Sequence, residues 1–239
     1  MITKDYSISL FKRFTNILFQ NKLNFEILKE HYAYDLMAKY MPLRYFPITS
    51  STLKFESMLT ILNDITINNR KNYIEFGSGL STLVVAKHAI LNKIDLQITS
   101  IEHDNQWIEI MEYYFKQEGI TNVTLLSIPL STSIISQNNL PWYDFKLLDS
   151  HCYNHTFDIA LVDGPPAYKK DNMLSRYQAI PFLKNKLNET YSIFLDDCNR
   201  PGEKKIIKQW EKEYKISFVA ISETFAYSAK GDNFNILNI

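Results

Sequence analysis

The sequence is poor in the residues and patterns that mark several classes of protein. Two cysteines in 239 residues cannot form a disulfide framework. No uninterrupted apolar run is long enough to span a membrane, and residues 1–6 lack the basic-then-apolar order of a signal peptide. Basic and acidic residues both number 26, whereas a protein that binds mainly nucleic acid usually carries a basic excess. We therefore expect a cytoplasmic protein with no transmembrane segment and no nucleic-acid partner.

Glycine is also scarce, at six residues, and two of them lie close together in the segment Tyr73–Thr82. There a short apolar strand runs into Gly77 and Gly79, and an amphipathic run over residues 80–91 follows at once. Such glycines let the backbone turn tightly and approach a ligand beside a helix N-terminus. A second strand ends on Glu102, near the offset of roughly 20 residues at which an acid can reach a ribose hydroxyl. The pattern predicts a nucleotide-binding β-turn-α-β unit.

Glu75, two residues before the first glycine, indicates which nucleotide binds. A dinucleotide places its anionic pyrophosphate at the helix N-terminus, where a carboxylate is a poor neighbour. S-adenosylmethionine instead carries an ammonium and a sulfonium, and Thr82 stands where the dinucleotide fingerprint has its third glycine. On these residues the chain resembles the class I S-adenosylmethionine-dependent methyltransferases, over residues 55–239. A nicotinamide-dependent oxidoreductase and a catalytically silent binding or scaffold protein are the alternatives.

The resemblance implies a cofactor site built from the glycine turn, the end of the second strand and the segment after the third strand. Its expected contacts are Glu75, Gly77, Ser78, Gly79, Ser81, Thr82, Glu102, His103, Ile128 and Leu130. Where many relatives present an acid or amide to adenine, this chain has Ser127–Leu130, so the contact would come from backbone and apolar side chains. For His103, the alternative is an exposed turn histidine without a ligand.

The alternation of strands and helices predicts an α/β, Rossmann-like fold with a mostly parallel, seven-stranded sheet covered on both faces. The predicted strands are 72–76, 97–102, 122–128, 157–162, 191–196, 216–221 and 233–238. The predicted helices fall near 80–93, 104–118, 171–187 and 202–213. The last two strands are joined without a helix, so the seventh should pair antiparallel with the sixth.

The N-terminal part of the chain reads differently from the rest. Residues 1–70 show helical spacing of apolar residues and many aromatics, and we expect them to form a helical cap on the methyltransferase domain of residues 71–239. A substrate lid, the surface of a homodimer and a helix lying on a membrane surface are the alternative interpretations of this segment.

Three carboxylates follow two predicted strands. Asp163 comes directly after strand 157–162, and Asp196 and Asp197 end the next strand. In the strand order that the resemblance implies, these strands are neighbours, so the three acids should meet at one edge of the sheet. Carboxylates that converge must bind a metal, retain a proton or be neutralised by a cation, for which Lys169, Lys170 and Arg200 are the candidates.

An all-carboxylate set suits Mg²⁺ or another hard divalent cation, with Asp163, Asp196 and Asp197 as ligands. The arrangement resembles the metal-dependent catechol-type O-methyltransferases, which use an acid after the fourth strand and an acid–amide pair after the fifth. Asp197 stands where the amide would be. The structural alternative is that Asp197 pairs with Arg200 or caps the turn before the helix from Glu203.

Val162-Asp-Gly-Pro together with Asp196-Asp-x-x-Arg-x-Gly-Glu203 resembles small bacterial methyltransferases often proposed to act on cell-surface glycans. This implies O-methylation of a small molecule or glycan precursor, in which Asp163 and Asp197 are the catalytic candidates for handling the hydroxyl proton. We expect Arg176 to be a solvated residue on a helix face, with binding of an acidic substrate as the alternative. N-methylation of a nucleobase is a further alternative, but Gly164 and Ala167 interrupt the motif on which it would depend.

Overall fold

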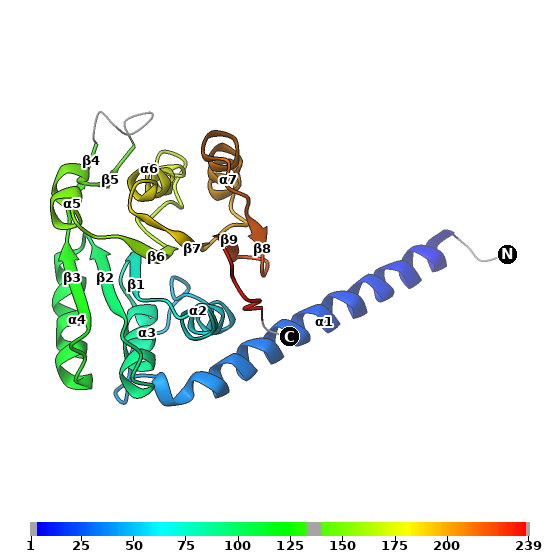
Figure 1. Cartoon of the computed structure of the whole chain (residues 1–239). Coiled ribbons are helices and arrows are strands. Elements are labelled where there is room, and N and C mark those ends of the chain that lie inside the picture. Colours follow the sequence, from blue (N-terminus) through cyan, green and yellow to red (C-terminus); the bar gives the residue numbers. More distant parts are fainter. Residues whose placement is uncertain (1–3, 133–139, 238–239) are drawn as a thin grey trace.

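The computed structural model describes residues 4–132 and 140–237; in the first helix, side chains are described at residue 15 and from residue 19 onward. At the centre lies a seven-stranded sheet with the strand order β3-β2-β1-β6-β7-β9-β8 (Figure 1). Its strands are β1 (Asn72–Phe76), β2 (Gln97–Glu102), β3 (Val123–Ser127), β6 (Phe157–Val162), β7 (Leu187–Leu195), β8 (Val219–Ala220) and β9 (Ala226–Lys230). The first five run parallel, whereas β9 runs antiparallel to both β7 and β8. This confirms the predicted Rossmann-like sheet and its antiparallel strand.

Helices pack on both faces of the sheet (Figure 1). One face carries α2 (Phe55–Ile67), α3 (Leu80–Leu91) and α4 (Asn105–Glu118), and the other carries α5 (Phe145–His151), α6 (Ala179–Leu183) and α7 (Pro201–Tyr214). Two 3₁₀ turns, η1 (Ala38–Tyr40) and η3 (Ser175–Gln178), and a two-stranded sheet of β4 (Leu130–Ser131) and β5 (Trp142–Tyr143) complete the body.

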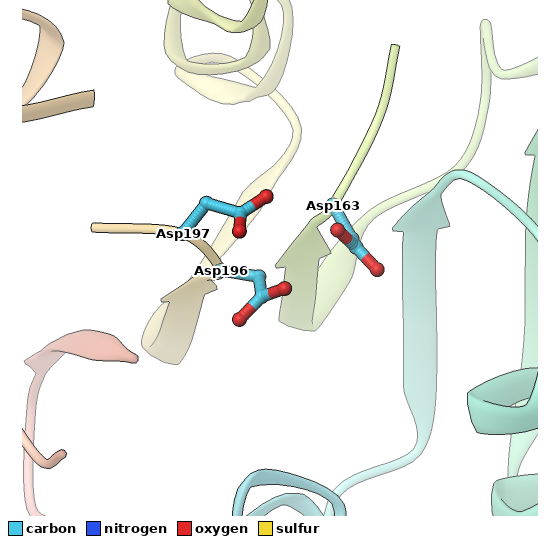
Figure 2. Close-up of side chains that lie close together, drawn as sticks. All are labelled: Asp163, Asp196 and Asp197. Atoms are coloured by element: carbon cyan, nitrogen blue, oxygen red, sulfur yellow. The ribbon is translucent and has the colours of Figure 1, made fainter. Parts of the chain in front are cut away.

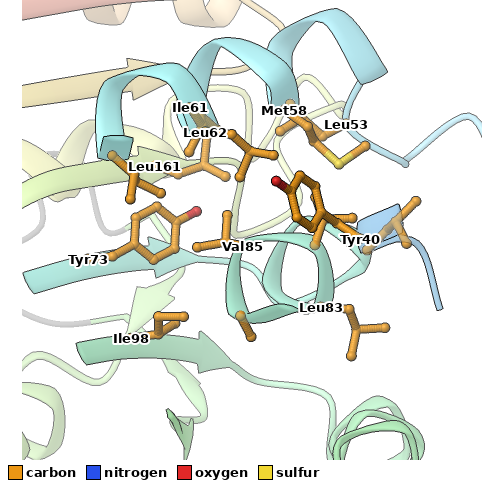
Figure 3. Packing of buried hydrophobic residues seen from close by; sticks show 14 of the residues in the cluster. Tyr40, Leu53, Met58, Ile61, Leu62, Tyr73, Leu83, Val85, Ile98 and Leu161 are labelled. Carbon is orange, nitrogen blue, oxygen red and sulfur yellow. The ribbon is translucent and has the colours of Figure 1, made fainter. Parts of the chain in front are cut away.

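The alternation of side chains along each strand divides the core between the two faces. In β1, Tyr73 packs with α2 and α3, whereas its neighbour Ile74 packs with the helices of the opposite face. Figure 3 shows the first of these clusters, in which Tyr73, Ile98 and Leu161 of the strands lie beneath Ile61 and other apolar residues of the helices. Both faces of the central strands are thus buried, so the functional side chains are left at the strand ends.

Helix α1 (Lys4–Met37) is a single helix of 34 residues that projects from the body at its N-terminal end (Figure 1). Near its C-terminal end, the Glu30 carboxylate accepts hydrogen bonds from the N–H groups of Phe55 (2.9 Å) and Glu56 (3.2 Å) at the start of α2. Farther out, apolar side chains such as Phe19 stay exposed. Among the described residues, no helix has both the length and the apolar character needed to cross a membrane. The lid, homodimer and membrane-surface interpretations stay predictions.

The predicted helix over 171–187 is wrong. The structure places η3 and the short α6 there, and β7 already begins at Leu187. The reason is Pro181, which has no N–H to donate and whose ring would clash with the carbonyl one turn earlier, that of Tyr177. That carbonyl instead accepts a hydrogen bond of 2.8 Å from the indole N–H of Trp210 in α7.

The predicted last strand, 233–238, is also wrong, and residue 238 lies outside the described residues. The last strand is β9, which pairs with residues 191–195 of β7 and ends before Gly231. Gly231 has a φ of +86°, and an added Cβ would lie 2.5 Å from the Thr190 hydroxyl oxygen, so only glycine fits where the chain leaves β9. The sixth strand is confirmed in place, although β8 is shorter than the predicted 216–221.

Candidate active site

The turn after β1 uses its two glycines in different ways. Gly77 has a φ of +97°, a region that favours glycine, and an added Cβ would lie 3.3 Å from the backbone nitrogen of Gly164. Its N–H donates to the Ile101 carbonyl at 2.9 Å, which ties the turn to β2. Gly79 has extended backbone with a φ of 179°, and an added Cβ would meet no atom within 4 Å. The Gly79 N–H is held by the Thr82 hydroxyl at 3.0 Å.

Glu75 lies behind this turn rather than in a cavity. Its side chain has no exposed surface, and its carboxylate accepts hydrogen bonds from the hydroxyls of Ser100 (2.7 Å), Tyr73 (3.0 Å), Ser81 (3.2 Å) and Thr82. Burial raises the pKa of Glu75 to about 7, although these four hydrogen bonds oppose the shift. The expectation that Glu75 lies directly beside the cationic groups of a cofactor therefore changes, because the geometry gives it a role in shaping the turn.

Glu102, at the end of β2, faces the glycine turn. Its Oε1 accepts from the N–H groups of His103 (2.7 Å) and Asp104 (2.9 Å), and its Oε2 accepts longer bonds from the N–H and hydroxyl of Ser78 (3.2 and 3.3 Å). Burial alone would raise the pKa of Glu102, but the hydrogen bonds, foremost that from His103, hold it below its usual value. The ion pair with Glu102 (2.8 Å) in turn raises the pKa of His103. Glu102 is thus an ionised acceptor whose Oε2 is only weakly engaged.

The three acids predicted to meet do so at the ends of β6 and β7 (Figure 2). The N–H of Asp163 donates to the carbonyl of Phe76, and the N–H of Asp196 donates to that of Val162, each at 3.1 Å. The backbone hydrogen bonds between the parallel strands therefore continue past the strand ends and hold Asp163 and Asp196 in register with the neighbouring strands. One ligand atom from each of Asp163, Asp196 and Asp197 lies within 4.8 Å of the others.

The crowding of these carboxylates perturbs their acidity. Burial, followed by the charge of Asp196, raises the pKa of Asp163 well above its usual value. Burial and the charge of Asp197 raise the pKa of Asp196 to about 6. Two of the three carboxyl groups therefore have a weakened preference for the charged form at neutral pH.

Arg176 is the functional candidate whose placement the sequence did not predict. The expected solvated helix-face arginine is instead 3% exposed and lies in η3 among the acids. Its guanidinium pairs with Asp197 Oδ2 at 3.1 Å and Asp163 Oδ1 at 3.4 Å. Although burial opposes the charged form, these carboxylates, Asp163 foremost, raise the pKa of Arg176. The sole signal in the sequence is a basic residue inside the otherwise uncharged run 172–183.

The expected pairing of Asp197 with Arg200 is present, with Arg200 Nη1 2.7 Å from Asp197 Oδ2. Lys169 and Lys170, the other candidates for neutralising the acids, are exposed, and the ammonium of Lys169 lies over the ring of Tyr168. Arginines rather than lysines therefore supply the positive charge at the acids.

Two adjoining cavities open at this edge of the sheet and share Ser51, Gly77, Ser78 and Asp163. The smaller, of about 200 Å³, is also lined by Glu102, His103, Tyr143, Gly164, Pro165, Pro166, Tyr168, Ser50, Arg176, Asp196, Asp197 and Arg200. The larger, of about 430 Å³, is also lined by Phe46, Pro47, Thr49, Thr52, Leu53, Gly79, Leu80, Ser81 and Trp107. Of the other predicted cofactor contacts, Thr82 and Ile128 are fully buried and Leu130 is partly buried in β4.

One wall of the larger cavity is the segment 46–53, which links the N-terminal helices. Its Phe46 ring packs edge-to-face on Trp107 with centroids 5.9 Å apart, and the Trp107 indole N–H donates to the Ser78 carbonyl at 2.9 Å. The predicted N-terminal cap thus contributes to the cavity beside the glycine turn, a contact that periodicity alone does not reveal.

No protein-family model matches the chain, and no curated protein matches it. Many solved structures do. A candidate caffeoyl-CoA O-methyltransferase from Staphylococcus aureus superposes with a TM-score of 0.58 at 15% identity, over 89% of this chain and 100% of that chain. An SAH-bound methyltransferase from Podospora anserina superposes with a TM-score of 0.57 at 15% identity, over 85% of this chain and 88% of that chain. A candidate O-methyltransferase from Klebsiella pneumoniae superposes with a TM-score of 0.55 at 15% identity, over 85% of this chain and 86% of that chain. The chain therefore has the fold of the class I S-adenosylmethionine-dependent methyltransferases.

Proposed function

We propose that this chain is an S-adenosylmethionine-dependent methyltransferase that acts on an oxygen of a small molecule or of a cell-surface glycan precursor. The observation that carries the proposal is Glu102, an ionised carboxylate that faces Ser78 at the edge of the cavity formed by the glycine turn. A carboxylate in this position can accept hydrogen bonds from a ribose diol. The fold shared with solved methyltransferases supports the same function.

The charges around the glycine turn favour a cationic ligand over a dinucleotide. Asp163 lines both cavities, and Asp196 and Asp197 line the smaller one, where the three acids outnumber Arg176 and Arg200. A pyrophosphate at the turn would lie close to these acids, whereas a sulfonium and an ammonium would be attracted to them. This distinguishes the proposal from the nicotinamide-dependent alternative.

The predicted cofactor contacts divide into two groups by position. Gly77, Ser78, Gly79 and Ser81 line a cavity and would hold the ligand directly, with Glu102 and His103 at the ribose. Glu75, Thr82 and Ile128 would act from behind by fixing the turn and the strand ends, as their burial requires. The Leu130 contact to adenine stays a prediction.

In the proposed reaction, Asp163 and Asp197 handle the proton of the acceptor hydroxyl. When bound, S-adenosylmethionine would supply the methyl group, with its S–CH3 bond broken as the new O–CH3 bond forms and S-adenosylhomocysteine as the leaving group. Both acids line the same cavity, and Arg176 and Arg200 hold Asp197 in place, so its free carboxylate oxygen can accept the proton. The walls of the cavity align the acceptor oxygen with the methyl group, and such orientation contributes several kcal/mol to catalysis.

The experiment is calorimetric titration of the purified chain with S-adenosylmethionine, with NADH as the comparator. We expect saturable binding of S-adenosylmethionine only. Glu102→Ala should weaken it about tenfold or more, because a hydrogen bond to a charged group contributes about 1.5 to 3 kcal/mol. Glu109→Ala, which removes an exposed carboxylate from α4, the helix that follows β2, is the matched control.

Absence of S-adenosylmethionine binding would refute the proposed function, and binding of NADH in its place would favour the oxidoreductase. Binding without transfer to any hydroxyl acceptor would leave the silent binding protein as the better description. Acceptor screening should begin with hydroxylated small molecules and glycan precursors.

A further inference from the structure

The carboxylates at the ends of β6 and β7 have a cation of their own. We propose that Arg176 is the resident counter-ion of Asp163 and Asp197 and positions both of them, so that this site operates with a guanidinium where related folds could use a divalent cation. The inference concerns the charge and geometry of the site. Its meaning for catalysis rests on the proposed function, but its test does not.

The Arg176 guanidinium is fixed by the backbone. Its Nε donates to the Pro165 carbonyl (3.2 Å), its Nη1 to the Asp196 carbonyl (3.3 Å) and its Nη2 to the Asp163 carbonyl (2.6 Å). All three nitrogens are therefore used, and the segments that follow β6 and β7 are joined through one side chain. A cation held in this way is part of the framework and does not move aside at low cost.

One carboxylate oxygen of Asp163 and one of Asp197 already face guanidinium groups. Asp197 Oδ2 lies 3.1 Å from Arg176 and 2.7 Å from Arg200, and Asp163 Oδ1 lies 3.4 Å from Arg176. A divalent cation on these oxygens would stand roughly 5 Å from two positive charges, which costs several kcal/mol at an effective dielectric constant near 20. The donor set thus fits a metal by residue type but not by its surroundings.

On the other side of Arg176 lies Glu203 of α7. Glu203 has no exposed surface, and its Oε1 is 3.8 Å from Arg176 Nη1. Within residues 4–132 and 140–237, neither of its carboxylate oxygens has a hydrogen-bond partner. A buried carboxylate without hydrogen-bond partners is stabilised by the nearest positive charge. The fold therefore requires Arg176 to stay beside Glu203.

The charges that remain fit the proposed cofactor. The carboxyl groups of Asp163, Asp196, Asp197 and Glu203 outnumber the two guanidiniums, of Arg176 and Arg200. Carboxyl groups are thus in excess, and a further cation nearby would favour their charged forms. Asp163 and Asp196 reach the cavity beside the glycine turn, where a sulfonium would meet this excess. A cationic ligand in the cavity and the guanidiniums of Arg176 and Arg200, which line the same cavity, together account for the arrangement without a metal.

The test measures binding of Mn²⁺ to the chelator-treated full-length protein by electron paramagnetic resonance, for the wild type, Arg176→Met, Arg176→Lys and Arg44→Met. Arg44 is exposed and serves as the control for loss of one positive charge. We expect the wild type and Arg44→Met to bind Mn²⁺ no more tightly than about 1 mM. Arg176→Met should bind it at least about tenfold more tightly, because the repulsion is gone, and Arg176→Lys should resemble the wild type.

Circular dichroism and thermal melts establish that each variant folds. Should Arg176→Met fail to fold, Arg176→Gln, which also removes the positive charge, is measured in its place with the same expected result. Binding of Mn²⁺ by the wild type at about 10 µM or tighter, abolished by Asp196→Asn, would overturn the proposal. So would an unchanged Mn²⁺ affinity in a folded Arg176→Met protein. Neither result depends on S-adenosylmethionine, so failure of this inference is distinct from failure of the proposed function.

Discussion

Replacing Gly77 by alanine should destabilise the fold, whereas the same replacement at Gly79 should not. At Gly77 the φ of +97° lies in a region that costs an L-residue about 1 to 3 kcal/mol. The new Cβ would also lie 3.3 Å from the Gly164 nitrogen, so the turn cannot relax freely in that direction. For a chain of this length, 1 kcal/mol corresponds to a shift in melting temperature of about 2 to 4 °C. We expect Gly77→Ala to melt roughly 4 to 8 °C below the wild type.

Gly79→Ala is the matched control, because its backbone is extended and an added Cβ meets nothing within 4 Å. Its melting temperature should stay within about 2 °C of the wild type. Since Gly79 lines the larger cavity, Gly79→Val should instead weaken binding of S-adenosylmethionine while the protein stays folded. Thermal melts by circular dichroism and calorimetric titration measure the two effects. Equal stability of Gly77→Ala and Gly79→Ala would refute the reasoning about the turn.

Three further predictions concern buried groups. Gly202→Ala would place a Cβ 2.0 Å from the Met173 carbonyl oxygen. It should therefore lower the free energy of unfolding, measured by urea denaturation, by about 2 to 4 kcal/mol. An unchanged denaturation midpoint would contradict the close packing of α7 against Met173. Asp64→Ala leaves the Arg70 guanidinium, 2% exposed, without its ion pair at 3.0 Å, and should cost about 3 to 5 kcal/mol in the same assay. Glu75 has a folded pKa of about 7 against 4.5, so its ionisation destabilises the fold increasingly as pH rises from about 4.5 to 7. The stability difference between the wild type and Glu75→Gln should therefore shift by about 2 to 3 kcal/mol in favour of the variant between pH 5 and 8, and a constant difference would argue against the raised pKa.

The parts of the fold that the sequence predicts are those governed by local patterns. The strand before Gly77, the helix after it and Glu102 at the end of β2 follow from periodicity and glycine spacing, and the structure has them in place. The meeting of Asp163 with Asp196 could also be predicted, because neighbouring parallel strands end at the same edge of the sheet.

The errors occur where contacts between distant segments override a local pattern. Residues 171–187 have helical spacing, but Pro181 and the hydrogen bond from Trp210 to the Tyr177 carbonyl leave only the 3₁₀ turn η3 and the short helix α6 there. Likewise, the residues from 233 onward have a stronger apolar pattern than β9, which predicts the last strand there. The last strand is β9 instead, because its backbone pairs with residues 191–195 of β7.

The burial of Arg176 could not be predicted from the sequence for the same reason. Its burial depends on carbonyls after two different strands and on a carboxylate of α7, and no local pattern reports such a combination. For Glu75, the motif identifies the residue but not the direction of its side chain. The carboxylate accepts hydrogen bonds from hydroxyl groups of β1, α3 and β2.

The position of β9 between β7 and β8 has a consequence for biosynthesis. Strand β7, which carries Asp196 and Asp197 at its end, is bonded to β6 on one side and to β9 on the other. A nascent chain leaves the ribosome from its N-terminus, so the glycine turn and all three acids emerge while β7 still has an open edge. The edge of β7 therefore stays open to pairing with other strands until residues 226–230 have been translated, and a ribosome stalled before that point would leave this edge exposed.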